Sequence, residues 1–146
     1  MQEHLLTSDP DISAIGDCAL FASPRLGVPL RLESVQNATD HARCVAARLT
    51  GDAKAYDGLP WFWSARGPDK LQIAGPYDRL RSCRGARQSG GRIVLDRCYK
   101  SDHLVGIESV NRAGDQVFGR RLLTSNRSVT PEQASISNQC WRKEVD

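Results

Sequence analysis

The fold is decided by residues 92–110, which read RIVLDRCYKSDHLVGIESV. Two mainly apolar, β-branched runs, Arg92–Tyr99 and Leu104–Val110, predict two strands. The polar stretch Lys100-Ser101-Asp102-His103 between them is typical of a hairpin turn. The charged pair Asp96-Arg97 interrupts the first run and predicts a β-bulge there. Strands joined by so short a turn pair antiparallel, so this stretch predicts an antiparallel sheet.

Segments on either side of this hairpin add a strand and helices. Leu71-Gln72-Ile73-Ala74 alternates like a strand. Asp115–Leu123 predicts a helix that ends near Asn126, and Pro131 fits the first turn of a short final helix. The stretch from Arg79 to Arg92 contains glycines and five arginines and predicts a loop. The second half is therefore expected to be a small α+β unit with a mainly antiparallel sheet.

The first half predicts one well-marked helix. Ser34 is a candidate N-cap, apolar residues recur at helical spacing from Val35 to Leu49, and Gly51 supplies a stop. Before this helix, Asp11–Ile15 predicts a short strand. Residues 23–30 contain two prolines and a glycine and predict a loop, with a brief extended segment at 30–32.

The length and composition fit one globular domain or part of one. The chain has 146 residues, of which 40% are hydrophobic and 25% charged, near globular averages. No apolar run approaches the about 18 residues of a transmembrane helix. The start of the chain lacks the pattern of a signal peptide. We therefore expect a cytoplasmic protein with no membrane association.

Charge and cysteine content narrow the class of partner and cofactor. Residues 1–58 are net acidic, whereas residues 59–146 are net basic, which fits either an ordinary solvated face or an electropositive surface for an acidic partner. No nucleic-acid-binding motif accompanies the arginines, so we expect an acidic protein rather than nucleic acid. The five cysteines form no C-x-x-C pair and the three histidines are scattered, so no disulfide framework or metal site is expected.

Three short segments carry candidate chemistry. Residues 7–17 match T-x6-A-x-G-D, in which Gly16 allows a close backbone approach and Asp17 offers a carboxylate to ligand hydroxyls. Arg31–Ala38 opens the helix, whose N-terminus presents free N–H groups and stabilises anions. Trp61-Phe62-Trp63 offers aromatic planes that stack on ring systems. Taken one at a time, these segments also fit an ordinary cap, a capped helix and core packing.

Together, in this order and spacing, the three segments resemble the FAD-dependent, NAD(P)H-oxidising ferredoxin reductases (the rubredoxin, putidaredoxin and rhodocoxin reductase group). The resemblance covers roughly residues 4–134. It continues through the segments Leu71–Gly75, Leu104–Asn111 and Gly119–Leu123. It implies that the chain holds the tail of a Rossmann-like FAD-binding domain, residues 1–58, followed by a reductase C-terminal domain, residues 59–146. The tail 135–146 departs from the family pattern.

The resemblance also implies roles for residues of this chain. Asp17 would bind the ribityl chain of FAD, with Gly16 allowing its approach. Glu33, Ser34 and Val35, joined by Gln36, would lie at the pyrimidine end of the isoalloxazine ring. Hydride would pass from NAD(P)H to the flavin, and electrons would leave singly to a ferredoxin with a 2Fe-2S cluster. Trp63 would stand against the flavin, and the basic residues Arg31 and Arg66 would receive the acidic ferredoxin.

The two G-x-G-x-x-G fingerprints of such reductases, for FAD and for NAD(P)H, do not occur in this sequence. Each nucleotide-binding domain takes about 100–150 residues. We therefore expect a C-terminal fragment that is inactive alone and needs an N-terminal reductase partner chain. The alternatives are a non-catalytic interaction or dimerisation module that uses its basic surface, or the product of a decayed gene.

Overall fold

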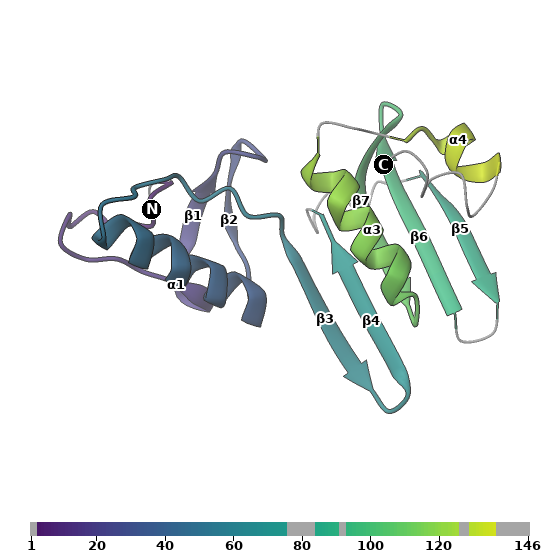
Figure 1. Ribbon diagram of the computed structural model, residues 1–146, viewed down its shortest axis with the longest axis horizontal. Coiled ribbons are helices and arrows are strands. Elements are labelled where there is room, and N and C mark those ends of the chain that lie inside the picture. Colours follow the sequence, from purple (N-terminus) through teal and green to yellow (C-terminus); the bar gives the residue numbers. More distant parts are fainter. Residues whose placement is uncertain (1–2, 76–83, 91–92, 126–128, 137–146) are drawn as a thin grey trace. The chain divides into compact units, whose positions relative to one another are not determined.

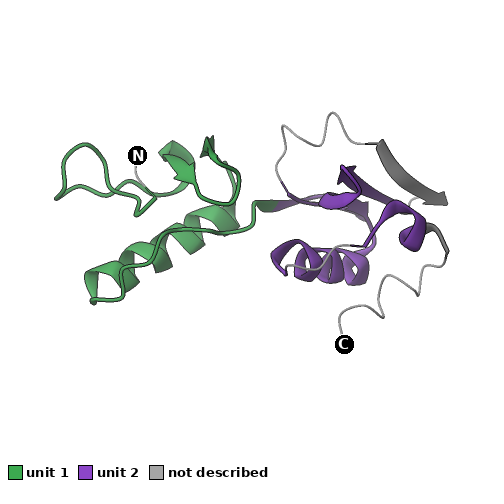
Figure 2. Ribbon diagram, turned by 90° about the horizontal axis from the view of Figure 1, so that it is seen from above, with its two compact units in different colours: residues 1–61 green, residues 62–146 purple. Residues whose placement is uncertain are grey.

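The computed structural model describes residues 3–75, 84–90, 93–125 and 129–136. The chain divides into two compact units, Met1–Trp61 and Phe62–Asp146, shown in Figure 1 and coloured separately in Figure 2. Each unit contains its own β-sheet, which has two strands in the first unit and five in the second.

The first unit combines a two-stranded sheet with one long helix. Strands β1 (Leu20–Ser23) and β2 (Val28–Arg31) pair antiparallel, with Phe21 opposite Leu30. The 3₁₀ turn η1 (Gly16–Cys18) precedes β1, and helix α1 (Val35–Leu49) follows β2 and packs on η1 (Figure 1). The core of this unit is small and gathers Leu5, Phe21 and Tyr56, with Leu30, Leu32, Cys44 and Val45 packed against them.

Helix α1 confirms the sequence prediction at both ends. Ser34 is extended and its Oγ accepts a hydrogen bond from the Asn37 N–H at 3.1 Å, which satisfies one of the free amides of the first turn. The helix ends at Leu49, and Gly51, two residues on, adopts a φ of +96° that continues no helix.

Two predictions for the first unit are wrong. Residues 11–15 form no strand, and Ser13 makes only an isolated antiparallel bridge with Leu6. An extended segment becomes a strand only against a ladder of partners, and the described chain offers this segment a single bridge. The predicted loop at 23–30 instead contains most of β2. Pro29 is tolerated there because a two-stranded sheet has only edge strands.

The second unit is an α+β fold, as expected. Its five-stranded sheet has the order β3-β4-β7-β6-β5, and the pairs β4–β7, β6–β7 and β5–β6 are antiparallel. The elements are β3 (Trp61–Arg66), β4 (Asp69–Ala74), β5 (Arg84–Gly90), β6 (Ile93–Lys100), β7 (His103–Val110), α3 (Ala113–Thr124) and α4 (Pro131–Ile136). The predicted strand at 71–74, both hairpin strands and both helices are therefore confirmed.

The β6–β7 hairpin turns through Ser101 and Asp102, whose positive φ values of +49° and +61° are those of a two-residue hairpin turn that matches the right-handed twist of its strands. Its ladder shifts register between Cys98 and Tyr99, so the bulge lies just beyond the predicted pair Asp96-Arg97.

Helix α3 covers one face of this sheet, across β4 and β7 (Figure 1). Close approach is possible because Gly119 has no side chain, and a Cβ built there would lie 2.6 Å from Ile107 Cδ1. The hydrophobic core of this unit includes Ile73, Ala74, Leu95, Ile107, Leu122 and Val129.

The predicted arginine-rich loop is wrong for residues 84–90. They form β5 and pair residue for residue with β6, from Arg84 opposite Tyr99 to Gly90 opposite Ile93. Pairing with a strongly predicted neighbour overrides weak intrinsic strand preference. Arg79, Arg81 and Arg92 lie outside the described residues, as does the divergent tail beyond residue 136.

Within the described ranges, no helix is both long and apolar enough to cross a membrane.

Candidate functional site

The predicted turn at Gly16 and Asp17 presents a carboxylate at the surface. Gly16 is buried and has a φ of +74°, a conformation that side chains disfavour. Its N–H donates to His41 Nδ1 at 3.2 Å, and its carbonyl accepts from the Ala19 N–H at 3.0 Å. A Cβ at Gly16 would lie 3.4 Å from the Cβ of Ala38 on α1. The glycine thus lets the turn sit against the helix while Asp17 remains exposed.

Arg31 connects this turn to the segment that enters α1. Its Nη1 donates to the Asp17 carbonyl oxygen at 3.3 Å, and its Nη2 lies 2.7 Å from Glu33 Oε1. Both charged side chains are more than half exposed, so the ion pair adds little stability. Because Arg31 contacts both the Asp17 backbone and the Glu33 side chain, it brings two of the predicted segments together.

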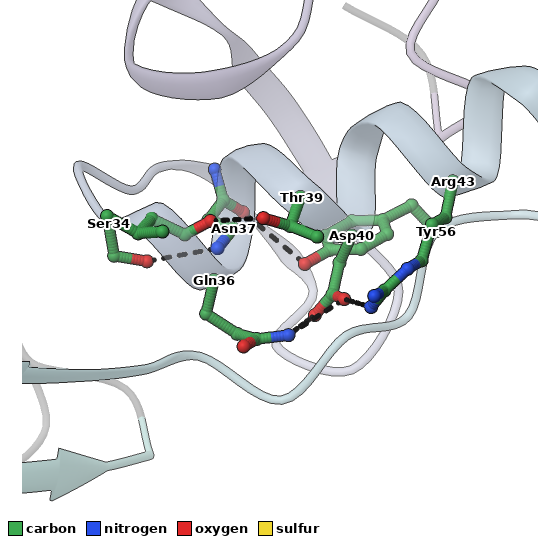
Figure 3. A network of polar contacts seen from close by, with 8 residues as sticks. Ser34, Gln36, Asn37, Thr39, Asp40, Arg43 and Tyr56 are labelled. Atoms are coloured by element: carbon green, nitrogen blue, oxygen red, sulfur yellow. Dashed lines mark hydrogen bonds and ion pairs between the residues drawn. The ribbon is translucent and has the colours of Figure 1, made fainter.

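The N-terminus of α1 confirms the predicted capping geometry around Ser34. The first intrahelical bond runs from the Ala38 N–H to the Ser34 carbonyl, so the amides of Val35 and Gln36 lie in the turn that has no intrahelical acceptor. Val35 is 69% exposed. The Gln36 side chain points towards the next turn of the helix, where its Nε2 donates to both Asp40 carboxylate oxygens at 2.8 and 2.9 Å (Figure 3).

Buried polar residues that the sequence analysis missed support this N-terminus. Asn37 donates from Nδ2 to the Leu32 carbonyl at 3.1 Å. Its Oδ1 accepts from the Tyr56 hydroxyl at 3.3 Å (Figure 3). Asn37 and His41 lie four residues apart and so share a helix face. That spacing is the sequence signal that could have identified them as one buried face. Their hydrogen-bond partners could not be predicted in this way, because Gly16 and Tyr56 are distant in sequence.

Burial shifts the pKa values of three side chains in and beside this cluster, those of His41, Cys44 and Tyr56. It lowers the pKa of His41, although the neighbouring Asp40 carboxylate acts in the opposite direction. It raises the pKa of Tyr56 to about 12, with a further contribution from Asp40, and it raises the pKa of the Cys44 thiol. The support beneath the turn is therefore uncharged at neutral pH.

Trp63 and Arg66 lie in the second unit, on strand β3 at one edge of its sheet. Trp63 is 46% exposed, and Arg66 is exposed as well. A half-exposed indole on an edge strand offers an aromatic plane to a ligand or partner. The expectation that Trp63 faces the same ligand as Asp17 stays a prediction, because the two residues belong to separate units.

The second unit also contains buried charge between its sheet and α3. Arg97 and Asp115 are almost fully buried, and Asp115 pairs with Arg112 one turn earlier on the helix. Burial lowers the pKa of Arg97, while Tyr99 and Asp115 act to raise it. The Ser109 hydroxyl donates to Gln116 Oε1 at 3.2 Å in the same layer. The Ser109–Gln116 hydrogen bond joins β7 to α3.

Metal chemistry finds no support in the parts of the chain that the structure describes. No group of three or more His, Cys, Asp or Glu side chains gathers there in a way that could hold a metal ion. Cys18, Cys44 and Cys98 form no disulfide within the described part of the chain. Cys83 and Cys140 lie outside the described residues.

The first-unit arrangement offers a ligand two kinds of polar contact. Its exposed Asp17 carboxylate can accept hydrogen bonds from the hydroxyls of a sugar-like chain. The positive end of α1 can hold the electron-rich oxygens of a planar ring. Gly16, Asp17, Arg31 and the 33–36 segment are all brought together within one unit, through the contacts of Arg31 and of η1 with α1.

Residues 61–139 match the family model described as "Reductase C-terminal". The chain is 44% identical over 137 residues to rhodocoxin reductase of Rhodococcus erythropolis, covering 92% of this chain and 32% of that protein. Among solved structures, it is similar to the ferredoxin reductase for the CYP199A2 system from Rhodopseudomonas palustris. That similarity has a TM-score of 0.92 and 56% identity, and it covers 100% of this chain and 36% of the other.

A second solved structure is the covalent putidaredoxin reductase–putidaredoxin complex, with a TM-score of 0.82 and 30% identity over 90% of this chain and 32% of the matched chain. This chain therefore spans about a third of the length of these relatives. The family match covers more than half of its residues. From its sequence and its fold, the chain belongs to the reductase C-terminal family, whose relatives here are bacterial ferredoxin reductases.

Proposed function

We propose that this chain is the C-terminal part of an FAD-dependent NAD(P)H:ferredoxin reductase. The observation that carries the proposal is the first-unit site, in which Asp17 and the N-terminus of α1 lie together in a geometry that suits a flavin. Residues 1–58 would form the C-terminal segment of the FAD-binding domain, and residues 59–146 would form the reductase C-terminal domain. The division of the chain at residues 61 and 62 supports this assignment.

In this proposal each site residue has a binding or orienting role. Asp17 accepts hydrogen bonds from the ribityl hydroxyls, and Gly16 keeps the turn free of a side chain. The positive end of α1 faces the pyrimidine side of the ring. The residues that would lie there are Glu33, Ser34 and Val35, through their backbone, and Gln36. When bound, FAD supplies acceptance of a hydride from NAD(P)H and release of single electrons to a ferredoxin with a 2Fe-2S cluster.

In the second unit, we assign Trp63 to the flavin site and Arg66 to the surface that binds the ferredoxin. The half-exposed Trp63 indole would stack near the flavin and exclude water where nicotinamide docks. Arg66, with Arg31, would receive an acidic ferredoxin. A ferredoxin-type partner is supported by the relative that was solved in complex with putidaredoxin. Since NAD(P)H is the proposed donor, we place the reaction in the cytoplasm, where that donor is produced.

These residues do not include the nucleotide-binding fingerprints that such a reductase needs. Its sequence contains neither G-x-G-x-x-G fingerprint, and it spans about a third of its relatives. We therefore expect no NAD(P)H-dependent electron transfer from these residues alone. An N-terminal reductase segment, supplied as part of a longer chain or as a partner chain, would provide the pyrophosphate sites.

The test is an FAD titration followed by flavin fluorescence, with and without an N-terminal reductase segment from a relative. We expect saturable quenching when the segment is present. Asp17→Asn should weaken FAD binding by about 10- to 100-fold, because a charge-assisted hydrogen bond contributes about 1.5–3 kcal/mol. The matched control is Asp11→Asn, an exposed carboxylate in the same segment. Equal affinities of both variants and the parent would overturn the assignment of Asp17.

A further inference from the structure

His41 is a buried imidazole directly beneath the Gly16–Asp17 turn. Its side chain is completely buried. Its ring meets Phe21 at 4.8 Å and Tyr56 at 4.4 Å between centroids, both edge to face. The Gly16 N–H, 25 residues earlier in the chain, donates to its Nδ1 at 3.2 Å. One imidazole nitrogen therefore holds the backbone that precedes Asp17.

This hydrogen bond sets the protonation form of His41. A nitrogen that accepts from an N–H carries no proton, so the neutral ring has its proton on Nε2. In the described part of the structure Nε2 is buried and has no hydrogen-bond partner. An imidazolium would have N–H groups at both nitrogens, so Nδ1–H would face the Gly16 N–H. Two donors cannot bond to each other, so protonation and this contact exclude one another.

The groups around His41 favour the neutral form. On α1 itself, Asp40 is the charged neighbour and acts to raise the pKa, but burial outweighs it and lowers the pKa. From the segment after α1, Tyr56 faces the ring and stays neutral, since its pKa is about 12. Strand β1 contributes the apolar ring of Phe21, and η1 contributes the Gly16 amide, with Asp17 next in sequence. The Cys44 thiol, one turn along α1, is likewise neutral.

We propose that neutral His41 is the positioning residue of the Gly16–Asp17 turn, and that its protonation releases the turn and lowers the affinity for the flavin. Gly16 has no side chain and can adopt many backbone conformations, so its left-handed φ of +74° is selected by contacts such as this hydrogen bond. Once its amide loses the acceptor, the Asp17 carboxylate is no longer fixed beside α1. The inference rests on the proposed function only for the identity of the ligand.

The first test needs no ligand. Long-range ¹H–¹⁵N spectra of the full chain at pH 7.5 should show His41 Nδ1 without a proton and Nε2 with one. A coupling across the hydrogen bond should connect Nδ1 to the Gly16 amide nitrogen. On acidification this coupling and the Gly16 amide shift should change together, with a midpoint below the ordinary histidine value of 6.5. A proton on Nδ1 at neutral pH, or a Gly16 amide that ignores the titration of His41, would overturn the proposal.

Variants separate positioning from a general packing role. His41→Asn and His41→Gln retain an acceptor and cannot be protonated, whereas His41→Leu retains bulk and loses the acceptor. With an acceptor-retaining variant, Gly16 amide exchange and FAD affinity should become independent of pH between 5 and 8, after correction for intrinsic exchange. His41→Leu should show weaker FAD binding by about tenfold at pH 7.5, the effect of one buried N–H without an acceptor.

His103→Gln is the matched control, because His103 is an exposed histidine at the start of β7, and it should leave the pH profile unchanged. Circular dichroism identifies any variant that fails to fold, and the ligand-free titration of the parent chain then decides alone. If FAD binds at no pH even with the N-terminal reductase segment present, but Gly16 still follows His41, the proposed function fails and the positioning role stands. If FAD binds with one affinity from pH 5 to 8 in the parent, the positioning role fails and the flavin assignment stands.

Discussion

Gly16 and Gly27 share a backbone conformation but have different surroundings. Both belong to the first unit and have left-handed φ values of +74° and +67°. A Cβ at Gly16 would touch Ala38, whereas nothing lies within 4 Å of a Cβ at Gly27. The pair therefore separates the cost of an unfavourable backbone conformation from the role of one glycine in the site.

We expect Gly16→Ala and Gly27→Ala each to lower the free energy of unfolding by about 1–2 kcal/mol, the cost of a left-handed alanine. Denaturant unfolding measures this loss. Only Gly16→Ala should also weaken FAD binding, because only that turn carries Asp17. Equal losses of FAD affinity in the two variants would show that Gly16 acts through stability and not through the turn.

At this scale the sequence predicted residues whose chemistry is local. The Gly16-Asp17 turn and the Ser34 cap depend on neighbours within a few positions, so short patterns identify them. The support given by His41 and Tyr56 was not predicted. His41 bonds to a residue 25 positions away and Tyr56 to one 19 positions away. Such contacts depend on how the chain returns on itself, which one sequence does not state.

At the scale of elements, the helices were predicted because capping and periodicity are properties of one segment. Strand β5 was missed because its glycines and arginines disfavour a strand, and only pairing with β6 orders it. Residues 11–15 show the opposite error, since a suitable pattern found only a single bridge. In α1, apolar Val35 and Leu49 are exposed while Asn37 and His41 are buried. Periodicity thus predicted the helix correctly and its buried face only in part.

Helix α3 offers a test in which two effects oppose each other. Alanine is favoured over glycine in a helix by about 1 kcal/mol. At Gly119, however, a Cβ would lie 2.6 Å from Cδ1 of the fully buried Ile107. Overpacking of this kind costs about 1–3 kcal/mol. We therefore expect Gly119→Ala to lower the thermal midpoint of the second unit.

The control for this variant is Gly114→Ala, in the exposed first turn of the same helix. It should leave the thermal midpoint unchanged or raise it, because propensity acts there without the packing cost. A rise in midpoint for Gly119→Ala would mean that α3 can move away from β7 at little cost.

At the scale of the whole molecule, the two units should respond to acid in opposite directions. The lowered pKa of His41 adds stability to the first unit above about pH 6.5, and this is lost as the pH falls through the lowered value. Burial, and Asp96 directly opposite on β6, raise the pKa of Glu108 in the second unit. A raised carboxyl pKa adds stability that is fully present below about pH 4.5 and is lost as the pH rises through the raised value.

Residue-resolved hydrogen exchange between pH 7.5 and 5 checks this. Protection in α1 should fall with acid and protection in β6 and β7 should rise, after correction for intrinsic exchange. Glu108→Gln should stabilise the second unit at pH 7 by about 0.2–1 kcal/mol, because it removes a like-charge pair across two strands. It should also remove the acid-induced rise in protection. Parallel changes in both units would contradict the assignment of opposite signs.

The strand order of the second unit has a consequence for how the protein is made. Strands β5, β6 and β7 are neighbours in both sequence and sheet, so they can pair as soon as each is complete. Strand β4 pairs with β7, which begins about thirty residues after β4 ends. At a synthesis rate of about 5–20 residues per second, the aromatic β3–β4 segment waits some seconds for its partner. During translation, the β3–β4 pair that carries Trp61-Phe62-Trp63 therefore presents the edge of β4 until β7 is made, and such an edge favours aggregation.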